Sequence, residues 1–202
     1  ENTIVWYCSD NGGLVKETSG GREKKGSIYE GGLRVPGIIE WPARKLKGRT
    51  SIPVATFDIY PTLLSLAGVE LYAPHPLDGM DVSGIITGSI TKRSKPMGFW
   101  HKLQGGQGTR SDQIQKAIME KQQAGAPLPT GHAAWNDWPW KLHRIKGTKF
   151  ELYNLSDDPM EKTDLSKNPE QAQRVKQMQQ ELDAWMRSVI RSINGKDYQE
   201  SK

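Results

Sequence analysis

Residues 3–13, TIVWYCSDNGG, form the most informative stretch of this sequence for its fold. The part at 3–8 is a short apolar run rich in residues that favour β-strands, and the part at 9–13 is a polar, glycine-rich turn. A strand that is apolar on both faces is what the centre of a parallel sheet requires, so the run predicts a central parallel strand of an α/β fold. The rest of the chain supplies few neighbours for such a strand, and we therefore expect the sheet to be incomplete.

After this turn the chain alternates between loops and short elements. Residues 12–37 are polar and rich in glycine, which predicts a long ordered loop, and loops of that length in compact domains usually serve a function. A second strand is expected at 37–41. A helix is expected at 59–67, with Asp58 as its cap and Gly68 at its end.

The composition of the chain changes at 91–96, which predicts a boundary between two parts. We expect the part at 1–95 to be α/β and the part at 96–202 to be a small α+β subdomain.

Three elements are expected in this second part. A polar segment at 111–124 predicts a helix, and alternating apolar residues at 140–145 and 149–153 predict a hairpin. A long amphipathic helix at 169–193 is the clearest prediction, because Asn168 can cap it and apolar residues recur along it at helical spacing.

The overall composition narrows the class of protein. Lys and Arg number 28 against 23 Asp and Glu, so the formal net charge is +5. A basic balance suits nucleic acid, an anionic polysaccharide or a merely solvated surface, and we favour the last because no nucleic-acid motif accompanies it. No apolar run approaches the ~20 residues that a membrane-spanning helix needs. Cys8 is the only cysteine, which excludes an internal disulfide, and a start at Glu1 without a leader suggests a mature or truncated product.

Three polar residues near the start have the chemistry to bind a metal ion and an anion. Asp10 and Asn11 directly follow the first strand, and their two hard oxygen donors suit Ca²⁺ or Mg²⁺. The alternative for this pair is an ordinary turn. Lys25 lies in the glycine-rich loop, where a flexible backbone can bring an ammonium group toward a sulfate or phosphate. The alternative for Lys25 is a solvated surface charge.

Two blocks of sequence, in their order and spacing, resemble the sulfatase family. They are SDNGG at 9–13 and KGSIYEGGLRVP at 25–36. The resemblance continues through DIYPTLL at 58–64, LDG at 77–79 and ELYNL at 151–155, and it covers most of the chain apart from a variable gap at about 100–138.

This resemblance implies the C-terminal portion of an alkaline-phosphatase-like α/β sandwich, followed by a subdomain with an antiparallel sheet and a long terminal helix. It implies that Asp10 and Asn11 are two of the ligands of a metal ion, usually Ca²⁺, and that Lys25 contacts the sulfate as a catalytic and substrate-binding residue. The family's nucleophile is a formylglycine made from Cys or Ser in C/S-x-P/A-x-R. Cys8 does not match this pattern, because Asp10 and Gly12 stand where Pro or Ala and Arg are required. We therefore expect Cys8 to be a packing residue, and the chain to need the upstream part of the domain and to be inactive alone.

The resemblance further implies hydrolysis of a sulfate monoester on a small molecule or a carbohydrate, in a periplasmic, secreted or lysosomal location. Candidates for the substrate pocket fall in the variable gap: Trp100, His101, Gln104 and His132. Of these we expect His101 to bind substrate, the alternative for each being an ordinary core or surface residue. Neither a nucleic-acid partner nor a membrane span is expected.

Two other functions and one residue assignment stay open at this point. The chain could belong to a phosphate or phosphonate ester hydrolase of the same superfamily, or it could be a non-catalytic fragment that binds anionic polysaccharide. Arg22, Glu23 and Lys24 stand where the family more commonly has Arg-Gly-Gly, which leaves open whether Lys24 or Lys25 reaches the anion. We favour Lys25 because Gly26 and Ser27 follow it.

Overall fold

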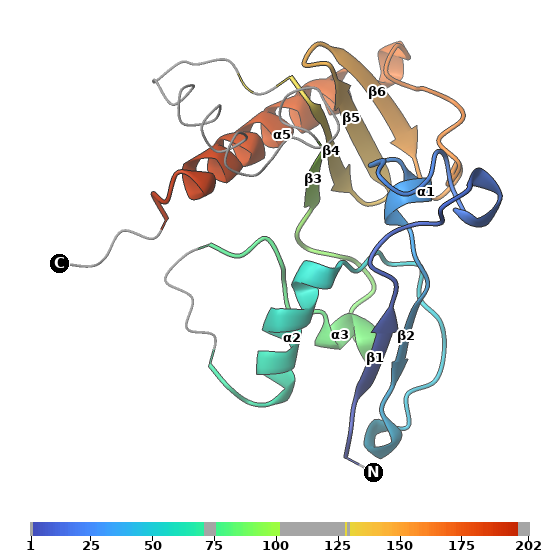
Figure 1. Ribbon diagram of the computed structural model, residues 1–202, viewed down its shortest axis with the longest axis vertical. Helices are drawn as coiled ribbons and strands as arrows, with labels where there is room; N and C mark the ends of the chain where they lie inside the picture. Colours follow the sequence, from blue (N-terminus) through green and yellow to red (C-terminus); the bar gives the residue numbers. More distant parts are fainter. Residues whose placement is uncertain (1, 71–75, 102–127, 129, 198–202) are drawn as a thin grey trace. The chain divides into compact units, whose positions relative to one another are not determined.

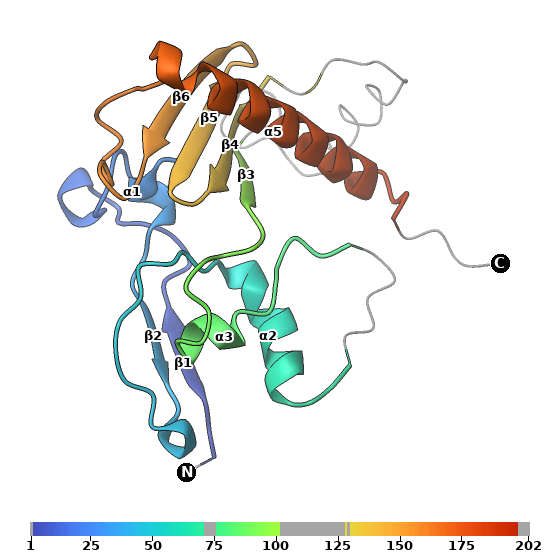
Figure 2. The same cartoon turned by 180° about the vertical axis from the view of Figure 1, so that it is seen from behind.

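The computed structural model describes residues 2–70, 76–101, 128 and 130–197. The chain forms two compact units (Figure 1, Figure 2). Unit 1 comprises residues 1–73 and 77–96, and unit 2 comprises residues 74–76 and 97–202. The helix predicted at 111–124 lies outside the described residues. Within the ranges given above, no helix is both long and apolar enough to cross a bilayer.

Unit 1 contains a two-stranded antiparallel sheet of β1 (Val5–Cys8) and β2 (Gly37–Glu40). The prediction of a parallel neighbour for the first strand is therefore wrong for the described residues. Apolar side chains on both faces of a strand do not specify the direction of its neighbour. In the described residues one face of β1 is also exposed, at Val5 and Tyr7. Here the long loop returns the chain antiparallel to β1.

The loop between these strands contains two short helical pieces, η1 (Lys16–Thr18) and α1 (Glu30–Leu33). After β2 follow η2 (Pro42–Arg44), η3 (Thr56–Asp58), α2 (Ile59–Leu66) and α3 (Ser83–Ile86). The expected helix at 59–67 is confirmed, and Gly68 follows it with a φ of 68°, a left-handed conformation that glycine adopts without strain.

Asp58 does not cap α2 as predicted, because η3 runs directly into the helix and leaves Asp58 itself in a helical conformation. Its carboxylate instead accepts hydrogen bonds from the amide of Ala55 at 2.8 Å and from the amide of Met80 at 2.9 Å. Both of its oxygens also bind the guanidinium of Arg93, at 2.7 and 2.9 Å. Asp58 and Arg93 are both buried, so this ion pair connects the start of α2 to the segment after α3 inside the protein.

Unit 2 is a four-stranded antiparallel sheet with strands in sequence order. These strands are β3 (Met97–His101), β4 (His132–Asp137), β5 (Trp140–Ile145) and β6 (Lys149–Asn154). The predicted hairpin is confirmed as β5 and β6. Its turn places Lys146 and Gly147 in the left-handed region, with φ of 51° and 79°.

The helix α5 (Ala172–Ile193), preceded by η4 (Pro169–Gln171), packs on one face of this sheet (Figure 1, Figure 2). The Asn168 side chain accepts a hydrogen bond from the amide of Glu170 at 3.0 Å, as expected of a cap. Two apolar clusters join helix and sheet: Ala133, Leu182 and Met186 form one, and Leu142, Leu152 and Met178 form the other.

An ion pair adds to this packing. The guanidinium of Arg144 donates to the carboxylate of Asp183 on α5 at 2.7 Å. Burial lowers the pKa of Arg144, and the charge and hydrogen bond of Asp183 oppose that shift.

Candidate metal and sulfate site

The turn after β1 and the loop before β2 are joined by backbone hydrogen bonds. The amide of Gly12 donates to the carbonyl of Gly32 at 2.9 Å, and the amide of Lys25 donates to the carbonyl of Gly13 at 2.9 Å. The two sequence blocks that resemble the sulfatase family are therefore adjacent in space. The turn that carries Asp10 and Asn11 and the segment that starts at Lys25 form a single substructure within unit 1.

Glycines make this close approach possible. A Cβ atom on Gly12 would lie 1.9 Å from the carbonyl oxygen of Gly31, and one on Gly31 would lie 2.3 Å from the carbonyl oxygen of Glu23. A Cβ on Gly32 would lie 2.1 Å from the carbonyl oxygen of Ser27. These separations are far inside van der Waals contact, so only glycine fits at these three positions.

The Asn11 amide is oriented by the turn that it belongs to. Its Nδ2 atom donates to the carbonyl of Gly12 at 3.2 Å, and the Ser9 hydroxyl donates to the Asn11 carbonyl at 2.9 Å. Because the nitrogen of the side-chain amide makes this local bond, the amide oxygen is directed away from it. Asp10 is exposed beside it. A carboxylate and an amide oxygen on adjacent residues are a donor pair that fits a hard divalent cation.

Two such donors do not by themselves fill the coordination shell of a metal ion. In the described part of the chain, no group of three His, Cys, Asp or Glu side chains lies close enough to hold a metal ion. A Ca²⁺ ion takes about six to eight oxygen ligands, so the two residues would hold such an ion together with groups from elsewhere.

Lys25 and Lys24 are both exposed. The carbonyl of Lys24 accepts a bond from the amide of Ser27 at 3.0 Å, which closes a tight turn around Lys25 and Gly26. Glu23, just before this turn, has a φ of 63°. Glycine adopts this left-handed conformation without strain, which explains why the family more commonly has glycine at position 23. In this chain Glu23 adopts the same conformation although it has a side chain.

One contact of the loop has no signal in the sequence. The guanidinium carbon of Arg22 lies 4.0 Å from the centre of the Tyr29 ring. Tyr29 and its neighbour Ile28 are buried, so the stacked arginine joins the loop before Lys25 to a buried aromatic side chain. The residues are seven positions apart in an irregular loop, where no periodic pattern could reveal the pair.

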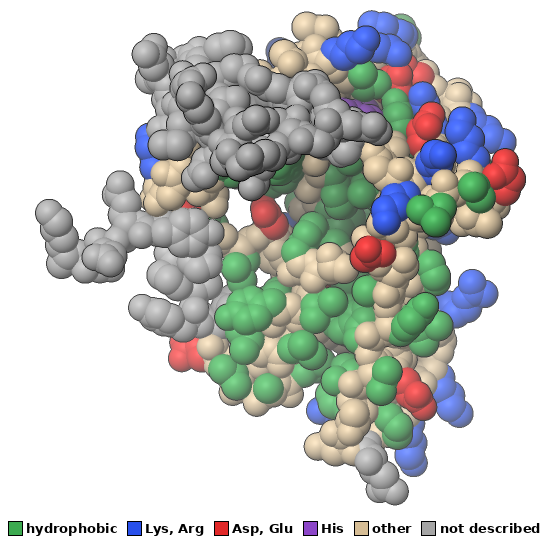
Figure 3. All heavy atoms as spheres, viewed as in Figure 1, with side chains coloured by type: hydrophobic (Ala, Val, Ile, Leu, Met, Phe, Trp, Pro, Cys, Tyr) green, Lys and Arg blue, Asp and Glu red, His purple; other side chains and the backbone are tan. Residues whose placement is uncertain are grey.

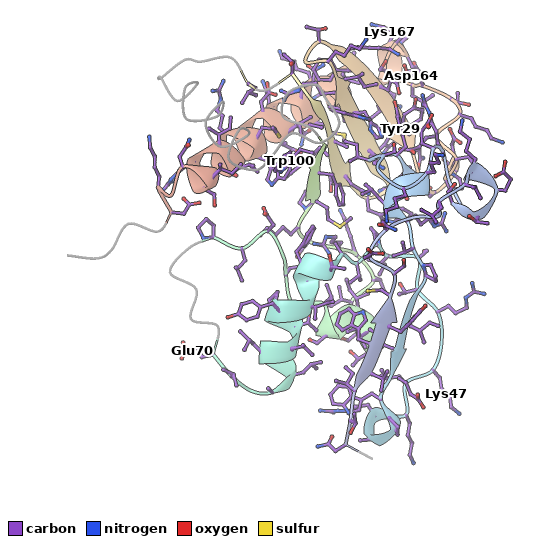
Figure 4. All side chains as sticks on the ribbon, in the orientation of Figure 1. Tyr29, Lys47, Glu70, Trp100, Asp164 and Lys167 are labelled. Carbon is purple, nitrogen blue, oxygen red and sulfur yellow. The ribbon has the colours of Figure 1, made fainter. Side chains whose placement is uncertain are left out.

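The predicted pocket residues belong to unit 2 and are partly described. Trp100, labelled in Figure 4, lies in β3 with 37% of its surface exposed. His101 ends the same strand, opposite His132 of β4, but its side chain and the whole of Gln104 lie outside the described residues. His132 is partly buried, and its Nε2 atom lies 2.9 Å from Nδ1 of His143.

The face of the sheet opposite α5 holds a chain of buried polar side chains. His143 places its Nε2 atom 2.8 Å from Oε1 of Glu161, and the Lys141 ammonium lies 3.2 Å from the same oxygen. All three side chains are buried. His143 and Glu161 are 18 residues apart, so no local pattern in the sequence indicates their contact.

The fold as a whole has counterparts among solved structures. Ps i-CgsB in complex with k-i-k-neocarrahexaose matches with a TM-score of 0.67 at 24% identity, covering 98% of this chain and 42% of that one. BT4656 in complex with D-glucosamine-2-N,6-O-disulfate matches with a TM-score of 0.63 at 21% identity, covering 98% and 36%. The class defined by this likeness is the alkaline-phosphatase-like α/β fold.

Sequence comparison gives the family. The sulfatase family model matches residues 1–69. A sulfatase of Formosa agariphila is 34% identical over 198 aligned residues, which cover 92% of this chain and 33% of the relative. Arylsulfatase J of Mus musculus is 31% identical, with coverage of 82% and 32%. The chain belongs to the sulfatase family, and it spans about a third of the length of these two relatives.

Proposed function

We propose that this chain is the C-terminal part of a sulfatase that hydrolyses sulfate monoesters. The observation that carries this proposal is the pair of backbone bonds, Gly12 to Gly32 and Lys25 to Gly13, that joins the Asp10–Asn11 turn to the Lys25 loop. These bonds bring two kinds of group into one substructure. The oxygen donors of Asp10 and Asn11 can bind a cation, and the flexible ammonium group of Lys25 can bind an anion. That combination suits an ester whose acid group carries negative charge on several oxygens, as a sulfate monoester does.

In this proposal Asp10 and Asn11 are two ligands of a divalent cation, which we take to be Ca²⁺ because both donors are hard oxygens. When bound, the cation supplies positive charge against the oxygens of the sulfate. The remaining ligands come from parts of the enzyme outside this chain.

Lys25 has the second role. Its ammonium group contacts a sulfate oxygen and offsets the negative charge that grows as the ester bond breaks. The glycine-dependent contacts around the loop hold its backbone, so that the side-chain torsions alone set the position of the ammonium group.

The nucleophile, a formylglycine by family resemblance, belongs to the part of the enzyme outside this chain. Cys8 is not its precursor, since it lies half-buried in β1 and lacks the flanking residues of the motif. The chain alone is therefore expected to have no turnover.

A sulfated carbohydrate is the substrate class that we propose. Two solved structures of the same fold hold sugars, k-i-k-neocarrahexaose in one and D-glucosamine-2-N,6-O-disulfate in the other. In this chain Trp100 and His101 on β3 are the candidates for sugar and sulfate contacts, because an aromatic face suits a sugar ring and an imidazole bonds a hydroxyl or sulfate oxygen. From the resemblance to the sulfatase family we also propose a periplasmic, secreted or lysosomal location.

A second candidate is hydrolysis of a phosphonate or phosphate ester. The phosphonate monoester hydrolase of Agrobacterium radiobacter shares the fold, with a TM-score of 0.51 at 20% identity. The deciding experiment is an assay of the full-length enzyme with 4-nitrophenyl sulfate, 4-nitrophenyl phosphate and a phenylphosphonate monoester. The proposal requires the sulfate ester to have the highest kcat/KM. A preference for either phosphorus ester would favour the second candidate, and no hydrolysis of any ester would favour a non-catalytic polysaccharide-binding protein.

A further inference from the structure

Positive charge is distributed unevenly over unit 1. Its sequence holds short basic clusters at 22–25, 43–49 and 92–95. The first cluster belongs to the loop of the candidate site. In the third cluster, Arg93 is buried against Asp58, and the Lys95 ammonium group donates to backbone carbonyls. The cluster at 43–49, ARKLKGR, takes part in neither the candidate site nor the interior.

This cluster carries four exposed cations: Arg44, Lys45, Lys47 and Arg49. We call residues 44–49 the basic loop. No ion pair joins any of its four cations to an Asp or Glu of the described residues. The sequence has no acidic residue between Glu40 and Asp58. Four like charges at this spacing repel one another, and a bound polyanion would relieve that repulsion.

The backbone of the basic loop is held in place at its start. Pro42 begins η2, and its carbonyl accepts a hydrogen bond from the amide of Lys45 at 3.1 Å. The guanidinium carbon of Arg44 lies 5.1 Å from the centre of the Trp41 ring. Trp41 and Leu46 are half-buried, whereas the cations are exposed. The loop therefore presents its charges beside an aromatic side chain, and less freedom is lost when an anion binds to groups already held in place.

The basic loop and the candidate site lie at opposite ends of the β1–β2 sheet. Val5 pairs with Glu40, so the chain leaves β2 beside the start of β1, whereas Asp10 follows the end of β1. The four residues of β1 separate these ends by about 10 Å, at about 3.3 Å per residue. Figure 4 labels Lys47 at the end of unit 1 that carries the N-terminus, and Figure 3 shows Lys and Arg side chains around the same end.

The exposure of the basic loop does not depend on the part of the enzyme outside this chain. Lys and Arg side chains are almost never fully buried without a partner of opposite charge. Covering the loop with further protein would require acidic groups for all four cations. The loop is therefore expected to stay at the surface of the full-length enzyme.

We propose that the basic loop is a second binding site for a sulfated polysaccharide, separate from the site that holds the reacting sulfate ester. Sulfate groups recur along such a polymer, so several can meet the four cations at once, and the ring of Trp41 suits a sugar. Contacts at two places on one polymer raise the local concentration of its esters at the candidate site. The choice of a sulfated polymer rests on the proposed function, but binding at the loop requires no catalysis.

A nucleic acid is the other polyanion that such a charge pattern could bind. Single strands bind to proteins through rows of aromatic side chains on which successive bases stack. The sequence has no aromatic residue between Trp41 and Phe57, so the basic loop offers no such row. A sulfated polysaccharide needs the charges alone, and we therefore favour it.

Direct binding tests the inference. The purified chain is titrated with a heparin oligosaccharide at several salt concentrations, and the Kd is measured by calorimetry. Lys47→Ala combined with Arg49→Ala should raise the Kd by about tenfold or more. It should also lower the slope of log Kd against log salt by about two, because two cations no longer release counterions from the polymer. Lys16→Ala combined with Lys92→Ala is the matched control: it removes the same charge from exposed positions elsewhere on unit 1, and its Kd should stay within about twofold.

Circular dichroism of each variant checks that the chain still folds, which is expected because the substituted side chains are exposed. Absence of heparin binding, or a Kd that the loop variant leaves unchanged, would overturn the inference. An equal loss in the control variant would do the same, because net charge alone would then account for binding. Tighter binding of an oligothymidine of equal charge would identify the ligand as nucleic acid instead.

Two further measurements separate the basic loop from the candidate site. A larger rise in Kd for Lys25→Ala than for the loop variant would place the heparin at the candidate site and overturn the inference. Sulfatase activity of the full-length enzyme is measured independently with 4-nitrophenyl sulfate, which is too small to reach both sites. Heparin binding at the loop without this activity leaves the second site standing and counts against the proposed function.

Discussion

The amide nitrogen of Lys25 lies 2.9 Å from the carbonyl oxygen of Gly13, to which it donates a hydrogen bond. Gly13 is two residues from Asn11, so this bond fixes the backbone of the lysine beside the turn that carries the two candidate metal ligands. The exposed side chain of Lys25 is therefore attached at a defined point next to Asp10 and Asn11.

Replacing Lys25 by alanine in the full-length enzyme should lower kcat by about two to three orders of magnitude, because loss of one group that stabilises developing charge typically has this effect. Lys24→Ala is the matched control, since it removes an equally exposed ammonium group from the adjacent position. Steady-state kinetics with 4-nitrophenyl sulfate gives both values. A larger loss of kcat in Lys24→Ala than in Lys25→Ala would assign the anion contact to Lys24.

Substitution of Asp10 should remove the metal ion. In Asp10→Ala one hard ligand is lost, and we expect the calcium content of the full-length enzyme, measured by atomic emission, to fall together with its activity. Chelation of the unchanged enzyme should reproduce the loss, and added Ca²⁺ should restore it. Glu17→Ala, which removes an exposed carboxylate from the same loop, should retain full calcium content. Unchanged calcium in Asp10→Ala would refute the ligand assignment.

The glycine positions of the site differ in their tolerance of a side chain. Gly12→Ala should destabilise unit 1 strongly, because its Cβ would lie 1.9 Å from the backbone oxygen of Gly31 and backbone atoms cannot rotate away. Gly37→Ala should be tolerated, since no atom lies within 4 Å of its Cβ position. Thermal unfolding of the chain by circular dichroism compares the two. Equal melting temperatures would show that the turn and the loop do not approach as closely as described.

The buried chain from Glu161 to His132 determines which nitrogens of the histidines carry protons. A carboxylate between Lys141 and His143 accepts hydrogen bonds, so Nε2 of His143 carries a proton. If His143 is neutral, its Nδ1 atom then accepts a hydrogen bond from Nε2 of His132. Ring ¹⁵N chemical shifts of the chain at neutral pH should show this tautomer for His143. Glu161→Gln should weaken the preference of His143 for a proton on Nε2, because an amide can donate a hydrogen bond as well as accept one. Glu170→Gln is the control: Glu170 is exposed, and its substitution should leave this preference unchanged. A protonated Nδ1 in the unchanged chain would contradict the arrangement.

The elements predicted best from the sequence are those whose signals are local. The terminal helix has a cap at Asn168 and a repeated apolar face, and the β5–β6 hairpin has alternating residues on either side of a glycine turn. The antiparallel pairing of β1 with β2 could not be predicted, because apolar residues on both faces of a strand do not specify the direction of its neighbour.

The candidate site shows the same limit. The resemblance identified Asp10, Asn11 and Lys25, but composition and spacing alone favoured a turn and a surface charge. The reason that the glycines are required became evident only from three-dimensional contacts, such as that between Gly12 and Gly31. Contacts between distant residues leave no periodic signal, and the Arg22–Tyr29 stacking is one of these.

The ion pair of Asp58 and Arg93 joins residues 35 positions apart and should dominate the stability of unit 1. Arg93→Met keeps most of the side-chain volume but leaves the Asp58 carboxylate buried without its countercharge, which typically costs about 3–5 kcal/mol. The same carboxylate also accepts the amides of Ala55 and Met80, so its charge cannot be moved to solvent without breaking the start of α2. Lys92→Met is the control, because it removes the same charge from an exposed neighbour and should change stability by less than about 0.5 kcal/mol. Urea unfolding of the chain measures both values, and a loss for Arg93→Met no larger than that for Lys92→Met would show that the pair contributes little to the fold.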